Sequence, residues 1–135
     1  MAKQYTTMPN TEALYEPFGI VEAVRSGNTI YLSGQVGIDA ELKPIAGFEA
    51  QAKAMFQRLK EVLEKAGGKE EDIVQVMAFI EDPGSEEAFM DRVMKSFGIF
   101  KECLPKCKTT STAVGVARLA IPGGLIEMQA IAVID

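Results

Sequence analysis

The stretch that decides the fold is Gly27-Asn28-Thr29-Ile30-Tyr31-Leu32-Ser33-Gly34-Gln35, near the start of the chain. Its first part is a turn signal, Ser26-Gly27-Asn28, and residues 29–33 that follow are rich in β-branched and aromatic side chains. Residues 18–24 before the turn mix apolar and polar positions. Together they predict a β-hairpin. The two glycines that follow, Gly34 and Gly37, allow either a close approach of the backbone to another group or a simple bend.

The middle of the chain predicts two helices with a strand between them. Apolar residues recur at helical spacing over 52–66, and Gly67-Gly68 marks the end of this first helix. Residues 73–80 form an apolar run typical of a buried strand. Ser85 is a good N-cap for a second helix, which Gly98 is expected to end. Residues 39–47 are expected to be a loop with a short strand.

The C-terminal part predicts a second hairpin, with strands over 109–119 and 125–134 joined by a turn at Pro122-Gly123-Gly124. Hairpins at both ends and helices between strands indicate one α+β domain over residues 1–135. Its sheet carries both helices on one face. The other face is left uncovered in a single chain, which predicts a homo-oligomer.

Composition excludes several classes of function. The net charge of −5 argues against nucleic acid as a partner, because phosphate binding needs concentrated Lys and Arg. No segment approaches the about 18 apolar residues that span a bilayer, so no membrane partner is expected. The N-terminus lacks the apolar segment of a signal peptide, so a cytoplasmic location is expected.

The chain contains no histidine, which limits its chemistry. Ser-His-Asp and Cys-His catalysis and His-based metal sites are excluded, so a general base must be a carboxylate, Lys, Tyr or Cys. Cys103 and Cys107 lack further Cys or His partners, so we expect two free thiols, no metal and no cofactor. Lysines on both sides of Cys107 could lower its pKa, although an ordinary loop cysteine is the preferred interpretation.

One carboxylate is unusual in its setting. Glu127 lies between Ile126 and Met128 in the last predicted strand, and alternation points it to the opposite face from both neighbours. In a half-buried cleft, desolvation would raise its pKa and make it a better base. The alternative is a residue on a solvated face or in an interface salt bridge.

Two parts of the chain resemble the Rid family of reactive intermediate deaminases, also called the YjgF family. They are the opening stretch, residues 27–35, and the C-terminal runs 114–119 and 125–133. The resemblance covers about residues 17–134. It implies a chorismate-mutase-like α+β fold with a mixed sheet, assembled as a homotrimer with small-molecule pockets between subunits. Many members hydrolyse reactive enamines and imines without a cofactor.

The resemblance also implies roles for individual residues. Gly34 matches the family's pocket glycine, and Glu127 matches the glutamate that orients the attacking water. Three positions depart from the pattern. Ser111 stands where an arginine holds the substrate carboxylate, Ile20 stands where a tyrosine is usual, and Asp91 falls at an asparagine position if one inserted residue is allowed. A hydroxyl cannot give the charged, bidentate grip of a guanidinium.

Basic residues elsewhere offer a substitute for that grip. Lys106 or Lys108 could bring an ammonium to the pocket mouth, although a solvated loop is the preferred interpretation. Arg118 matches a common family residue outside the anchoring position and is expected at the surface or in an interface.

Three functions follow from these observations. The first is hydrolysis of an enamine, imine or related C–N bond of a non-standard substrate. The alternative is a non-catalytic ligand-binding or regulatory trimer. A third, holdase or ribonuclease activity, is disfavoured for ribonuclease by the acidic charge and the absence of histidine.

Overall fold

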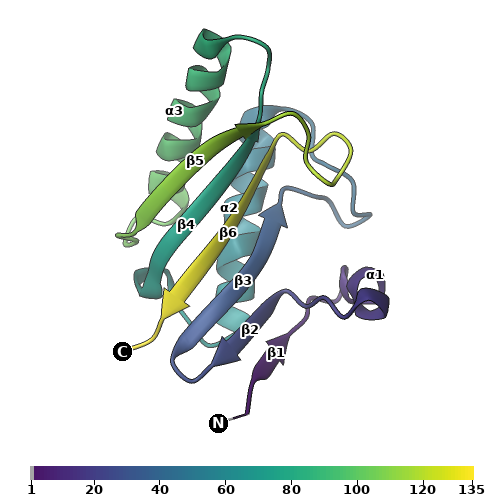
Figure 1. Ribbon diagram of the computed structural model, residues 1–135, viewed down its shortest axis with the longest axis vertical. Helices are drawn as coiled ribbons and strands as arrows, with labels where there is room; N and C mark the ends of the chain where they lie inside the picture. Colours follow the sequence, from purple (N-terminus) through teal and green to yellow (C-terminus); the bar gives the residue numbers. More distant parts are fainter. Residues whose placement is uncertain (1) are drawn as a thin grey trace.

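The computed structural model describes residues 2–135 as a six-stranded sheet with two long helices on one face (Figure 1). The elements in chain order are β1 (Gln4–Thr6), α1 (Glu12–Tyr15), the 3₁₀ helix η1 (Glu16–Phe18), β2 (Ala23–Ser26), β3 (Thr29–Val36), α2 (Phe48–Lys65), the 3₁₀ helix η2 (Glu70–Asp72), β4 (Ile73–Glu81), α3 (Glu86–Cys103), β5 (Thr110–Val116) and β6 (Ile126–Val133).

The sheet is mixed, with the strand order β1-β2-β3-β6-β4-β5. Strands β4 and β5 run parallel, and the other neighbours are antiparallel. The last strand, β6, lies inside the sheet, between β3 and β4. The predicted C-terminal hairpin is therefore wrong: β5 and β6 do not pair, because β4 lies between them and binds β5 in parallel and β6 antiparallel. The α+β class, the mixed sheet and the placement of both long helices on one face are confirmed (Figure 1).

The core lies between α2 and the sheet. The inward face of α2 is fully buried at Met55, Phe56 and Leu59, as the helical spacing of its apolar residues predicts. It packs over the alternate residues of the central strands that point toward the helices. The rings of Phe56 and Phe100 meet edge to face with their centroids 5.3 Å apart, which joins α2 to α3.

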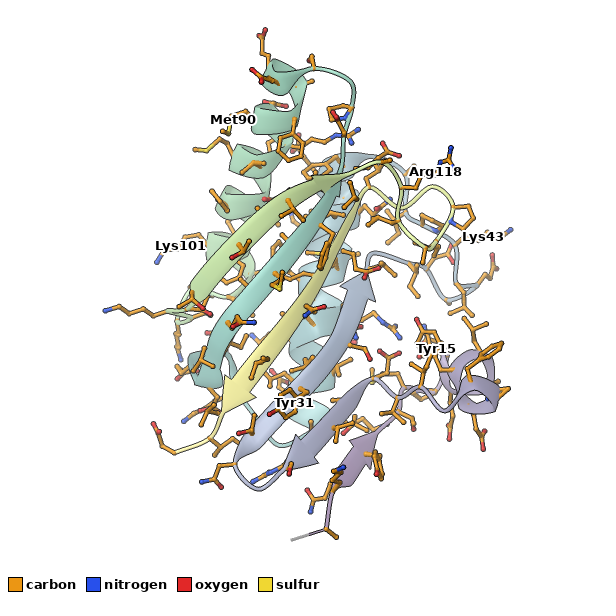
Figure 2. All side chains as sticks on the ribbon, in the orientation of Figure 1. Tyr15, Tyr31, Lys43, Met90, Lys101 and Arg118 are labelled. Carbon is orange, nitrogen blue, oxygen red and sulfur yellow. The ribbon has the colours of Figure 1, made fainter. Side chains whose placement is uncertain are left out.

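Within residues 2–135, neither long helix covers the opposite face of the sheet, and only the short α1 region approaches it, beside Glu127 (Figure 1). Tyr31 stands on this face, which is turned toward the viewer in Figure 2, with 51% of its surface exposed. Val114 and Val133 are also more than a third exposed. These apolar side chains are exposed in a single chain, and the homo-oligomer expected to cover this face stays a prediction.

The N-terminal region differs from the prediction. The first hairpin is real, but its first strand is limited to residues 23–26, and β1 pairs outside it. The predicted start at Phe18 is wrong, because Phe18 ends η1: Pro17 suits the first turn of a helix, and Gly19 then reverses the chain with a φ of 71°. Helix α1 and strand β1 were not predicted.

Three other predictions were wrong. Helix α3 continues through Gly98 to Cys103, because the core contacts of Ile99 and Phe100 outweigh the low helix propensity of one glycine. The predicted strand within 39–47 is only an isolated bridge between Ile38 and Pro44. Strand β5 ends at Val116, three residues before the predicted end. No helix within residues 2–135 is long and apolar enough to cross a membrane.

Candidate functional site

Glu127 lies on the open face of the sheet, on the central strand β6. Its neighbours Ile126 and Met128 are buried toward the helices, so the predicted alternation is confirmed. Its partners across the sheet are Val36 on β3 and Phe79 on β4. The carboxylate is half-buried, and this burial raises its pKa above the ordinary value.

Gly34 and Glu127 touch each other, as residues matched to one pocket should. A Cβ atom on residue 34 would stand 2.8 Å from the carboxyl carbon of Glu127, so only glycine leaves space for the carboxylate in this position. The pairing of β3 with β6 shifts between Leu32 and Gln35, and Gly34 lies in this bulge. Bulges redirect side chains and backbone locally, and they are common beside functional sites.

A cavity of about 330 Å³ opens in front of this pair. Three segments far apart in sequence line it: the α1 region, the strand β3 with the loop after it, and the loop before β6. Its lining residues are Thr11, Leu14, Tyr15, Gly34, Val36, Ile38, Leu42, Ala120, Ile121, Pro122 and Glu127. The lining is mostly apolar, with one carboxylate, one phenol and one threonine hydroxyl as its polar side chains. Few polar groups within an apolar wall are typical of small-molecule sites.

Tyr15 is the functional candidate that the sequence prediction missed. It ends α1 and points from there toward the sheet (Figure 2). Burial, and next the Glu22 carboxylate, raise the pKa of its phenol, while Arg58 lowers it and Glu127 adds a smaller rise. The phenol therefore stays protonated and can donate a hydrogen bond into the cavity. One sequence signal could have identified it: the family resemblance expects a tyrosine at the position of Ile20, and Tyr15 lies shortly before that position in the chain.

A buried polar network holds the α1 region against the sheet. The Arg58 guanidinium of α2 lies 3.0 Å from a Glu22 carboxylate oxygen, and it donates to Gln35 at 3.0 Å and to the Thr11 hydroxyl at 3.1 Å. Thr11 donates to Glu22, and Gln35 donates to the second Glu22 oxygen at 2.7 Å. These contacts satisfy a charge pair that would otherwise be costly to bury. They also fix Thr11, and so the start of α1, at the cavity.

A second buried amide positions the loop before β6. The Gln51 side chain donates to the carbonyls of Ile45 at 3.0 Å and Gly123 at 3.2 Å, and its oxygen accepts from the Leu125 amide. Gln51 is 1% exposed. The backbone of Gly37 passes so close that a Cβ there would stand 2.7 Å from the Gln51 carbonyl carbon. Helix α2 thus connects both loops that border the cavity.

Ser111 and Lys108 lie on the other side of the sheet. Ser111 pairs with the buried Val76 across the sheet. Ser111, Val76 and Lys108 all line a separate cavity next to α3. Met128 lines this second cavity as well, whereas the adjacent Glu127 lines the first. One chain therefore does not bring Ser111 or Lys108 to Glu127.

The remaining predicted residues also lie apart from Glu127 in one chain. Asp91 is exposed on α3 and pairs with Lys95 at 2.9 Å. Ile20 follows η1, is 45% exposed and does not line the Glu127 cavity. Lys106 is exposed in the loop after α3, and Arg118 is exposed in the loop after β5 (Figure 2). Their proposed roles remain predictions.

The cysteines are free thiols, and Cys107 does not have the low pKa that its neighbouring lysines suggested. Burial, and next the Glu70 carboxylate, raise the pKa of the Cys107 thiol to about 11. Such a thiol is almost all protonated at neutral pH and is a poor nucleophile. Within residues 2–135, no group of three or more acidic, Cys or His residues is arranged to hold a metal ion.

Comparison with known proteins supports the family given by the fold and these residues. Residues 11–134 match the Ribonuc_L-PSP family, described as Endoribonuclease L-PSP, which unites the YjgF, RutC and Rid proteins. The chain therefore belongs to this family. It is 35% identical over 116 residues to the 2-iminobutanoate/2-iminopropanoate deaminase of Dermatophagoides farinae, covering 84% of each protein.

Two further relatives show how far the likeness extends. A RutC family protein of Pyrococcus abyssi is 32% identical over 125 residues, covering 90% of this chain and 92% of its own. The crystal structure of E. coli TdcF with bound serine superposes with a TM-score of 0.73 at 25% identity, covering 86% of this chain and 88% of that one.

Proposed function

We propose that this protein is a hydrolase that cleaves an enamine, imine or related C–N bond, with Glu127 as the base that activates water. The observation that carries the proposal is the Glu127 carboxylate itself. It is half-buried against the Gly34 backbone, in a cavity whose other walls are mostly apolar. Burial raises the pKa of this carboxyl group, which makes its ionised form a stronger base.

The residues of the cavity support a simple reaction course. Glu127 takes a proton from water, and the water oxygen bonds to the imine carbon, forming a carbinolamine. The Tyr15 phenol, which is protonated, donates a hydrogen bond to the imine nitrogen and polarises the C=N bond. Glu127 returns this proton to nitrogen, which completes the neutral carbinolamine. It then takes the proton of the carbinolamine hydroxyl and delivers it to the amino nitrogen, so that the C–N bond breaks and a carbonyl compound and ammonia leave. No metal or organic cofactor enters this balance.

The substrate is proposed to differ from small 2-imino acids. The cavity that contains Glu127 has no Lys or Arg in its lining, and Ser111 occupies the position of the family's arginine anchor. A charge-assisted hydrogen bond is worth about 1.5–3 kcal/mol, so its absence lowers affinity or rate by about one to two decades. We therefore expect imines without a carboxylate to be better substrates than 2-iminobutanoate.

The same reasoning supports a site between subunits of a homotrimer. Ser111 and Lys108 lie on the opposite side of the sheet from Glu127 of the same chain. They can border the same cleft only if a neighbouring copy supplies them. The exposed apolar residues of the open sheet face are consistent with such an assembly.

The test compares two groups of imines generated in place. A threonine dehydratase supplies 2-iminobutanoate, and an amine oxidase supplies imines without a carboxylate from primary amines. Release of the carbonyl product is followed with wild type, Glu127→Gln and the matched control Glu61→Gln, an exposed glutamate of α2. We expect Glu127→Gln to lose activity and Glu61→Gln to retain it.

Three results would count against the proposal. Equal rates for wild type and Glu127→Gln would remove the catalytic role of the carboxylate. If no imine is hydrolysed but one of the amine or carbonyl compounds binds and Glu127→Gln weakens it, the protein is a ligand-binding trimer instead. Wild-type turnover of 2-iminobutanoate equal to that of an arginine-containing relative would show that another residue anchors the carboxylate.

A further inference from the structure

The proposed hydrolysis does not use the cavity on the helix side of the sheet. It measures about 360 Å³ and lies between the C-terminal half of α3 and strands β4–β6. This volume is within the range of about 300–1000 Å³ that is usual for small-molecule sites. Its lining consists of Phe56, Val76, Ala78, Ser96, Phe97, Phe100, Lys101, Cys107, Lys108, Thr109, Ser111 and Met128.

The interior of this cavity is apolar. Phe56 and Phe100 form its aromatic wall, and the buried side chains of Val76 and Met128 form its floor. The one hydroxyl buried there, on Ser96, already donates to the Val93 carbonyl at 2.7 Å. The interior therefore has no free hydroxyl to bind a polar ligand, and it favours a hydrocarbon group.

The mouth of the cavity has the opposite character. Lys101 on α3 and Lys108 in the following loop both line it, with the hydroxyls of Thr109 and Ser111 beside them. Lys101 extends from α3 toward solvent at the edge of the sheet (Figure 2). Within residues 2–135, neither lysine has a salt-bridge partner within 4.0 Å, and no carboxylate lines the cavity. Two unpaired ammonium groups favour an anion at this position.

The nearest buried carboxylate does not neutralise this mouth. The Glu70 carboxylate raises the pKa of the Cys107 thiol. Its Oε1 atom accepts a hydrogen bond from the Lys106 backbone amide at 3.3 Å, and this contact stabilises the loop after α3. Glu70 does not line the cavity. The charged side chains that the lining itself contains are therefore the two lysines.

We propose that this cavity binds a medium-chain carboxylate, with its hydrocarbon tail among Phe56, Phe97 and Phe100 and its carboxylate at Lys101 and Lys108. An apolar interior with a cationic mouth matches the two ends of such a molecule. Ser111 contributes by its small size, since a larger side chain there would fill the entrance. The proposal concerns binding only and stands whether or not Glu127 hydrolyses a substrate.

The experiment measures binding of octanoate to the full chain by calorimetry, with octanol and acetate as reference compounds. We expect octanoate to bind more tightly than either one, because octanol lacks the charge and acetate lacks the tail. Lys108→Met should weaken octanoate about two- to fivefold, as expected for one exposed charge contact, and should leave octanol unchanged. Lys106→Met, two residues away and outside the lining, is the matched control and should have no effect.

A filling variant tests the location. Ser111→Phe should abolish binding of both octanoate and octanol, while Glu61→Gln, at an exposed position of α2 outside the lining, should leave both unchanged. If Ser111→Phe is not folded by circular dichroism, the comparison of Lys108→Met with Lys106→Met decides. The proposal is overturned if wild type does not bind octanoate at millimolar concentration, or if both lysine variants weaken it equally. Folded Ser111→Phe that binds octanoate as tightly as wild type would also overturn it, because the ligand would then occupy another site.

Discussion

Burial of the Glu127 carboxyl group lowers the stability of the folded state when the group is ionised, so the loss of stability depends on pH. Its ordinary pKa is 4.5, and burial raises the pKa in the folded state. Below the ordinary value the group is protonated in both the folded and unfolded states, and no penalty arises. As pH rises through the raised pKa, the folded state must ionise a half-buried carboxyl, so its stability decreases.

We therefore predict that Glu127→Gln melts at the same temperature as wild type near pH ~4 and at a higher temperature near pH ~7.5. The comparison is made by thermal unfolding at both pH values, with Glu61→Gln as an exposed control. A large decrease in melting temperature at neutral pH would identify Glu127 as a structural ion-pair residue, and the catalytic assignment would lose its main support.

The raised pKa of Glu127 also predicts the pH dependence of hydrolysis. The base works only when ionised, so kcat/KM for a neutral substrate should rise with pH through an apparent pKa above 4.5. The measurement is a pH–rate profile with an imine supply that is not limiting. An acid limb at or below the ordinary carboxyl pKa would contradict the role of a half-buried base.

Tyr15 is predicted to act through its hydroxyl. Tyr15→Phe keeps the ring that covers the cavity and removes the donor, so we expect a loss of about one to two decades in kcat/KM for imines with little change in melting temperature. Tyr31→Phe is the control, because Tyr31 is half-exposed on the open sheet face and does not line the Glu127 cavity. Equal activity of both variants would limit Tyr15 to a packing role.

The site residues that could be predicted are those whose position along a strand fixes the direction of the side chain. The alternation around Glu127 and the glycine requirement at Gly34 follow from local sequence, and the structure brings the two residues into contact. Tyr15 was missed because a short helix, α1, carries it back over the sheet. That placement depends on Arg58, 43 positions further along the chain, which no local pattern shows.

The α1 segment depends on the polar network beneath it, and this dependence is testable. Arg58→Met leaves the Glu22 carboxylate buried without its charge partner, which typically costs about 3–5 kcal/mol. The double variant Glu22→Gln/Arg58→Met removes both charges and should recover part of this loss. Denaturant unfolding of wild type, Glu22→Gln, Arg58→Met and the double variant gives the coupling energy, and Arg118→Met is the exposed control. A cost below about 1 kcal/mol would show that the pair adds nothing to stability.

Helix α3 contains a glycine, Gly98, that no contact or backbone angle of the fold requires. Gly98 is exposed within the helix, its φ is not left-handed, and a Cβ atom there would have no neighbour within 4 Å. Gly98→Ala is therefore predicted to stabilise the protein by about 0.5–1 kcal/mol, because glycine loses more backbone entropy than alanine in a helix. Chemical denaturation checks this, and a destabilised variant would mean that the residue makes contacts in an assembly.

The elements with strong periodicity were predictable, and those stabilised by distant contacts were not. The apolar spacing of α2 and the apolar run of β4 identify both elements without reference to the rest of the chain. Strand β1 has only three residues and exists because it pairs with β2. Gly98 was expected to end α3, but local propensity is weak beside the burial of the next residue, Ile99.

Across the whole molecule, the sheet separates two surfaces with different chemistry. The open face carries Glu127 and its cavity, and the helix side carries the cavity with Ser111 and Lys108. Parallel pairing of β5 with β4 puts Ser111 beside the buried Val76, so the separation is a consequence of strand register. Residues that the family resemblance assigns to one pocket therefore require a second copy of the chain to meet.

The open face is the surface that a trimer would cover, and this gives the last prediction. Sedimentation should show a species of about three times the 14.6 kDa chain mass, with a melting temperature that rises with protein concentration. Tyr31→Glu puts a charge on the open face and should shift the protein toward monomer, because a buried unpaired charge opposes association. Met90→Glu is the matched control, since Met90 is 54% exposed, close to the 51% of Tyr31, but projects from α3 (Figure 2). If both variants keep the wild-type mass, the subunits do not meet at the Tyr31 end of the open face. If Met90→Glu alone dissociates the protein, α3 forms the interface, and the cleft that joins Glu127 to Ser111 must be redrawn around that helix.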